Sequence, residues 1–146
     1  MRNIHYKKVG IFFTLLLGMI SNVYAISPIT VTDGYIKASI PGSDVTAAYM
    51  TISNATNKAI TLQKISSTIS DRVEIHEHSM SNGMMRMREV GQITIDANSK
   101  VVLQPSSLHL MIFSIKQKIT EKDVIPFTLY FSNETKINIQ LPVYRY

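Results

Sequence analysis

Hydrophobic and polar residues alternate in short runs along most of the chain after residue 28. The runs are four to eleven residues long and rich in Ile, Val, Thr, Tyr and Phe, which is typical of β-strands. No stretch after residue 28 keeps the helical period of about 3.6 residues for three turns. We therefore expect strands at residues 29–39, 47–53, 59–65, 72–78, 84–90, 100–103, 108–115, 125–131 and 136–143.

Turn-forming residues separate these runs. Segments 41–44, 54–57, 81–83, 96–98 and 132–133 supply Pro, Gly, Asn, Asp or Ser, which tolerate tight or left-handed backbone. Many short strands separated by such turns predict an all-β sandwich or barrel. We expect a single domain at residues 26–146, because these 121 residues suffice for one modest core.

The first 25 residues follow a different pattern. Arg2, Lys7 and Lys8 precede an apolar run from residue 9 to 20, and Ala25 offers a small residue for signal peptidase. A retained membrane anchor is the alternative, but this run is about a dozen residues long where a spanning helix needs about twenty. We expect residues 1–25 to be a cleaved signal peptide and the mature protein to be periplasmic, without stable membrane insertion.

The absence of cysteine narrows the possible functions. There is no thiol for a lipid anchor, a blue-copper centre or a paired-thiol redox enzyme, and structural zinc usually needs thiolates. An exported domain of this kind must be stabilised by packing, without disulfides.

The charge of the mature chain is modest. Three of the fifteen basic residues and none of the ten acidic residues lie in the leader, so the net charge falls from +5 to +2 on cleavage. The remaining basic residues form no run with interleaved aromatic residues, so we expect no nucleic-acid partner.

One segment concentrates soft metal ligands. All three mature histidines and five of the six mature methionines lie between residues 76 and 111, and only Met50 lies outside. Thioethers are soft and imidazoles borderline ligands, a combination that favours Cu(I) over hard ions. Strand alternation places His76 and His78 on one face of their strand, and it turns His109 and Met111 away from the apolar face of theirs.

The spacing of these residues sharpens the prediction. His76 is followed by ten residues and Met87, then by twenty-one residues, His109, one residue and Met111. His109 and Met111 would lie side by side on a strand, about 7 Å apart, and a hairpin turning at residues 81–83 could bring His76 and Met87 to the same ion. Four neutral ligands suit Cu(I) better than Zn(II), which usually recruits thiolate or carboxylate.

This pattern resembles the PCuAC family of periplasmic copper chaperones, which is defined by the motif His-x10-Met-x21-His-x-Met. The similarity spans about residues 33–143, including segments 47–50 and 124–127. The resemblance implies a cupredoxin-like Greek-key sandwich that binds Cu(I) through His76, Met87, His109 and Met111. It also implies delivery to the CuA centre of cytochrome c oxidase, directly or through a Sco-type thiol protein. Phe113 stands where many members carry a methionine.

Further residues of this segment have two readings. His78, Met80 and Met85 are possible auxiliary ligands, although histidine and methionine near a hairpin end are more often solvated. Met84 lies on the face opposite Met87, and methionine in such a place is commonly a core filler, so we expect it to pack.

We expect Glu74 and Glu77 to be solvated charges, although either could accept the free N–H of a ligand histidine.

Two other classes of function are alternatives to copper transfer. Four soft ligands would fill a tetrahedral shell and leave no open position, so we do not expect an enzyme. A metal-free exported sandwich that serves as a binding or adhesion module is the alternative to a copper chaperone.

Overall fold

The computed structural model describes residues 27–145, so the expected signal peptide lies outside the described residues. Within this range no helix is long and apolar enough to cross a membrane. The described chain forms ten strands: β1 (Ile29–Lys37), β2 (Thr46–Asn54), β3 (Ile60–Ser67), β4 (Arg72–Ser81), β5 (Met84–Glu89), β6 (Ile93–Ile95), β7 (Ser99–Leu103), β8 (Leu108–Phe113), β9 (Val124–Phe131) and β10 (Lys136–Tyr144).

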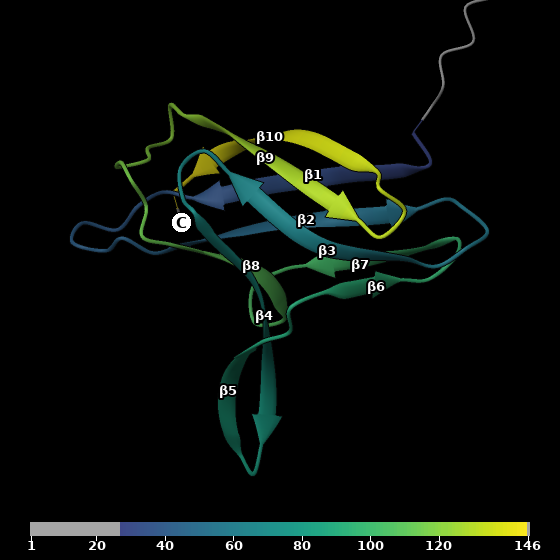
Figure 1. Ribbon diagram of the computed structural model, residues 1–146. Helices are drawn as coiled ribbons and strands as arrows, with labels where there is room; N and C mark the ends of the chain where they lie inside the picture. Colours follow the sequence, from purple (N-terminus) through teal and green to yellow (C-terminus); the bar gives the residue numbers. More distant parts are fainter. Residues whose placement is uncertain (1–26, 146) are drawn as a thin grey trace, which may run out of the picture.

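The strands form two antiparallel halves over a shared core (Figure 1). One half has the order β5-β4-β8-β2-β1, with β7 also paired to β2, and the other has the order β10-β9-β3-β6. A short parallel pairing of β1 with β10, in which Ile36 lies opposite Val143, joins them. Strands distant in sequence, such as β2 and β8, are neighbours. The predicted all-β Greek-key sandwich is confirmed.

The core is built from the inward-facing residues of both halves. Ile52, Leu62, Leu110, Ile112 and Leu129 are completely buried. They come from the four strands β2, β3, β8 and β9, and in each strand their sequence neighbours point the other way, as the period of two requires. Burial of this apolar surface supplies the main driving force for folding, and it leaves the outer face of β4, β8 and β2 available for other chemistry.

All nine predicted strands are present, and the differences are local. The prediction missed β6, whose three residues are too few for alternation to be recognised. It also ended the fourth strand at His78, whereas β4 continues to Ser81. His78 and Met80 therefore lie on a paired strand rather than at its end.

The β4–β5 hairpin extends away from the sandwich (Figure 1). Asn82 and Gly83 connect its strands with φ values of 52° and 75°, the two positive angles that a type I′ turn requires. Every residue of β5 is exposed. The expectation that Met84 packs in the core is wrong: its side chain is 56% exposed, because no element covers either face of the outer hairpin.

Candidate metal site

Strand β8 places two of the expected ligands. It lies between β4 and β2, and its Leu110 and Ile112 point into the core. His109 and Met111 point to the opposite face, as alternation predicts. That face is nevertheless covered at His109, which is only 4% exposed. The Tyr49 ring, on neighbouring β2, lies 6.4 Å from the His109 ring between centroids.

The histidines gather around His109. His76 on β4 lies directly opposite His109, with ring centroids 6.2 Å apart. The His78 ring lies closer, at 4.9 Å from His109 and edge-on to it. A metal–nitrogen bond of about 2.0 Å puts an ion roughly 3 Å from the ring centre. Two imidazoles whose ring centroids are 5 to 6 Å apart can therefore both bind a single ion.

Hydrogen bonds fix which nitrogens remain available. A carboxylate oxygen of Glu74 lies 2.8 Å from His76 Nε2, and because a carboxylate accepts, Nε2 carries the hydrogen. His109 Nδ1 likewise donates to the Ser107 carbonyl oxygen over 2.9 Å. These bonds leave the lone pair of His76 on Nδ1 and that of His109 on Nε2. His76 Nδ1 is buried and has no hydrogen-bond partner within residues 27–145.

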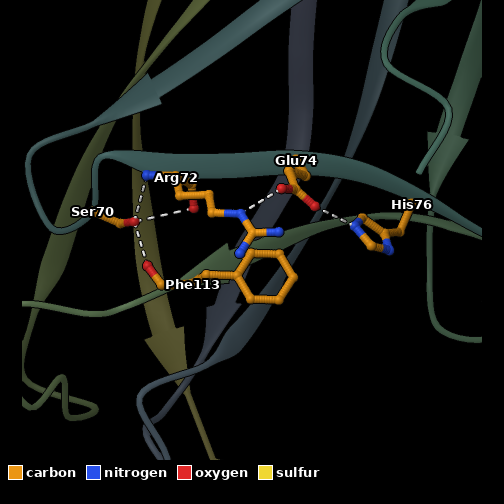
Figure 2. A network of polar contacts seen from close by, with 5 residues as sticks. All are labelled: Ser70, Arg72, Glu74, His76 and Phe113. Carbon is orange, nitrogen blue, oxygen red and sulfur yellow. Dashed lines mark hydrogen bonds and ion pairs between the residues drawn. The ribbon is translucent and has the colours of Figure 1, made fainter. Parts of the chain in front are cut away.

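Glu74 is itself held in place (Figure 2). Its second carboxylate oxygen accepts from Arg72 Nε at 2.6 Å, and the Arg72 guanidinium lies over the Phe113 ring, 4.4 Å from its centroid. Phe113 also flanks His76, at 5.9 Å between ring centroids. Ser70 closes this network by accepting from the backbone N–H of Arg72. The aromatic residue at position 113 thus positions the supporting groups of His76.

The electrostatic surroundings keep the Glu74 carboxyl ionised and the His109 imidazole neutral, which are the forms that a metal site needs. The hydrogen bond from His76, assisted by Arg72, lowers the pKa of Glu74 despite the opposing effect of burial. Burial lowers the pKa of His109, and the nearby His78 and His76 add to this effect, while the bond to Ser107 opposes it. An ionised carboxylate beside His76 and a neutral imidazole at His109 favour ligation.

The expected methionine ligands are placed differently. Met111 follows His109 on the same face of β8, opposite Glu74. Met87 lies opposite His78, not His76. Glu74 and His78 are four residues apart on β4, about 13 Å at a rise of about 3.3 Å per residue, and β5 and β8 flank β4 about 10 Å apart. The structure therefore brings together His76, His109 and Met111. Met87 lies further out along the hairpin, opposite a residue two positions beyond His76.

His78 lies between His109 and Met87. Its ring contacts His109, it is directly opposite Met87, and its buried Nδ1 has no hydrogen-bond partner within the described range. Of the two glutamates considered as acceptors, Glu74 contacts a histidine, whereas Glu77 pairs with Arg88 at 2.9 Å.

A groove of about 540 Å³ opens beside Met111 on the side of β2. Its lining includes Tyr49, Ile40 and three cationic side chains, Lys37, Lys118 and Arg145. The alternation pattern did not reveal Tyr49 or this groove, because both depend on β2 pairing with a strand about sixty residues later in the chain.

No group of three or more His, Cys, Asp or Glu side chains is arranged to hold a metal ion in the described part of the chain. That finding concerns nitrogen, oxygen and thiol ligands and does not cover methionine thioethers. The candidate site is a mixed one, with imidazole nitrogens from β4 and β8 and thioethers from β8 and the hairpin.

Solved structures share this architecture. The copper-bound PCuAC domain from PmoF2 matches with a TM-score of 0.71 at 19% identity, covering 84% of this chain and 97% of that domain. The solution structure of CuI-DR1885 from Deinococcus radiodurans matches with a TM-score of 0.66 at 24% identity, covering 84% and 82%. The chain therefore has the cupredoxin-like fold of PCuAC domains, and the resemblance predicted from the motif is confirmed.

The family follows from the sequence match. The model described as "LpqE-like: Putative lipoprotein LpqE-like" matches residues 29–143, and the chain belongs to this family. A relative named "Putative lipoprotein Lxx21020" from Leifsonia xyli subsp. xyli is 27% identical over 79% of this chain and 69% of its own length. The uncharacterized protein RP573 of Rickettsia prowazekii is 30% identical over 66% of this chain and 54% of its own length. This chain therefore spans about half of that relative.

Proposed function

We propose that this protein is an exported copper chaperone that binds one Cu(I) ion and passes it to a cuproprotein. The observation that carries the proposal is the pair His76 and His109. They lie directly opposite each other, are held by Glu74 and Ser107 through one nitrogen, and keep the other nitrogen for an ion beside Met111. The copper-bound and CuI structures of similar fold support the choice of metal.

The ligand set we propose is His76, His109, Met111 and Met87. The first three are adjacent on the face of β4 and β8. Met87 belongs to the exposed hairpin and would complete the set when the hairpin bends toward β8. His78 would hold the intermediate position until then, because its ring already contacts His109. Two nitrogens and two sulfurs suit a monovalent soft ion.

Release follows from the same chemistry. Thioethers and imidazoles are neutral ligands, and thiolates bind Cu(I) more strongly because they are soft and charged. A partner cysteine can displace the ligands one at a time, starting with the exposed Met87 or with Met111 at the groove. Copper would then move from this protein toward a thiolate site.

We infer that the recipient is such a thiolate site, namely the CuA centre of cytochrome c oxidase, reached directly or through a Sco-type thiol protein. The motif resemblance supports this choice, as does the direction of ligand exchange. The location we propose is the periplasm, in agreement with the pattern of the first 25 residues and with the lipoprotein names in the family.

X-ray absorption spectroscopy on the Cu(I)-loaded protein, followed by mixing with a reduced CuA domain, tests this proposal. We expect separate nitrogen and sulfur shells around copper, and copper in the CuA domain after the proteins are separated. A metal shell without sulfur would contradict the ligand set. Failure of the wild-type protein to retain any Cu(I) would favour the metal-free binding module instead.

A further inference from the structure

The outer part of the hairpin carries an unusual concentration of exposed methionine. Met80, Met84, Met85 and Met87 are 69%, 56%, 64% and 51% exposed. Side chains this exposed contribute little to the core, and their apolar surface carries a solubility cost. Core packing therefore does not explain why four methionines occupy this hairpin.

Three of these methionines share one face. Met80 on β4 lies directly opposite Met85 on β5, and Met87 follows Met85 by two residues. Directly opposite residues have Cβ atoms about 4.5–5.5 Å apart, and residues two apart on a strand are separated by about 7 Å. Each sulfur is two bonds beyond its Cβ, so the three thioethers can converge on one ion. Met84, opposite Ser81, belongs to the other face.

The charged residues of the hairpin lie elsewhere. Arg86 and Arg88 alternate with these methionines and so point to the opposite face, where Arg88 pairs with Glu77. The acidic residue on the methionine face is Glu89, which lies opposite His76 and follows Met87 by two residues. Met80 and Met85, at the outer end of this face, have no carboxylate as a same-face neighbour, and thioethers alone select soft ions.

We propose that Met80, Met85 and Met87 form a second binding site for a soft monovalent ion, Cu(I) or Ag(I). It binds more weakly than the inner site, because its ligands are exposed thioethers without an imidazole, and only Met80 and Met85 remain to it once Met87 completes the inner set. Met87 is the shared residue: its neighbour across the strands is His78, whose ring contacts His109. Soft ligands thus form a continuous row from the exposed hairpin to the buried imidazole.

This row gives the outer site a role that rests on the proposed function. An ion captured at Met80 and Met85 can move inward by exchanging one ligand at a time, first to Met87 and His78 and then to His109. The ion-binding property of the hairpin itself does not depend on that role.

The test is a titration of the full protein with Ag(I), a redox-stable d10 ion, in chloride-free buffer, followed through 13C-labelled methionine methyl groups by NMR. We expect the first equivalent to shift the Met111 signal and the second to shift those of Met80 and Met85. The double variant Met80→Leu, Met85→Leu should lose the second equivalent and keep the first. Met84→Leu, equally exposed on the other face, should keep both.

Each alternative result has a distinct meaning. Retention of the second equivalent in the double variant, or its equal loss in Met84→Leu, would overturn the outer site and leave the methionines as a surface for protein contact. If Met111 never shifts in the wild-type protein while Met80 and Met85 do, the outer site stands and the proposed function fails. Equal loading rates of the inner site in wild-type protein and double variant would refute the entry role.

Discussion

Replacement of Glu74 by glutamine tests whether the support of His76 matters to copper affinity. The substitution keeps the size of the side chain and removes its charge. Glu74 accepts from His76 Nε2 at 2.8 Å and from Arg72 at 2.6 Å, and its side chain is only 14% exposed. Solvent therefore screens the interaction weakly, and its loss should be felt at the metal.

The expected magnitude follows from these contacts. A hydrogen bond to a charged group contributes about 1.5–3 kcal/mol, and about 1.4 kcal/mol corresponds to a tenfold change in affinity. Glutamine can still accept through its amide oxygen, so the loss should lie at the lower end of the range. We expect Glu74→Gln to weaken Cu(I) binding about tenfold, a typical effect for a group that orients a metal-binding histidine.

The assay is competition against a chromophoric Cu(I) chelator under anaerobic conditions, with thermal unfolding as a check on the fold. Glu77→Gln is the matched control, because Glu77 is on the same strand but pairs with Arg88 on the other face. We expect this control to bind within about twofold of the wild type. Equal affinities for the two variants would refute the assignment of Glu74 as the group that holds His76.

Three further predictions concern β8 and its surroundings. Met111→Leu should abolish tight Cu(I) binding in the chelator assay while the unfolding free energy changes by less than about 1.5 kcal/mol; a larger loss of stability would place Met111 in the core. Leu110→Ala should do the opposite, destabilising the fold by about 2–5 kcal/mol in denaturant titrations, because Leu110 is fully buried; an unchanged midpoint would contradict the core assignment. Burial lowers the pKa of His109, so its imidazole stays neutral somewhat below the usual pKa of about 6.5. Cu(I) affinity should therefore hold from pH 8 to about 6.5 and fall at more acidic pH, where protons compete with the metal. An affinity indifferent to pH between 5 and 7 would exclude histidine ligands.

Much of the fold could be predicted from the sequence because strands have a strict period of two. The alternation of Leu110 and Ile112 with His109 and Met111 predicts which side chains enter the core, and the structure agrees. The turn at Asn82 and Gly83 was recognisable because these residues adopt positive φ readily. The β6 strand was not predicted, because an alternation of hydrophobic and polar residues cannot be recognised in three residues.

The sequence predicts candidate ligands, but it cannot predict the register that decides which of them face each other. Motif spacing selects His76 and Met87, yet spacing cannot specify which residues lie opposite each other across a hairpin. The length of the turn decides this, and it pairs Met87 with His78 instead. The burial of His109 was equally hidden, since the ring that covers it, Tyr49, comes from a strand brought in by long-range pairing.

The prediction for Met84 failed for a related physical reason. Alternation correctly separated it from Met87, but a residue on the second face of a strand is buried only if another layer covers that face. The hairpin extends beyond the sandwich, so neither face is covered (Figure 1). An isolated hairpin cannot be distinguished from a covered one by its sequence pattern alone.

The most direct test of the central claim is an anaerobic titration of the mature protein with Cu(I) against a competing chelator, beside the double variant His76→Ala, His109→Ala. We predict that the wild type binds one equivalent tightly and that the folded double variant loses this binding. Equal retention of Cu(I) by both proteins, or no competition by the wild type, would contradict the account.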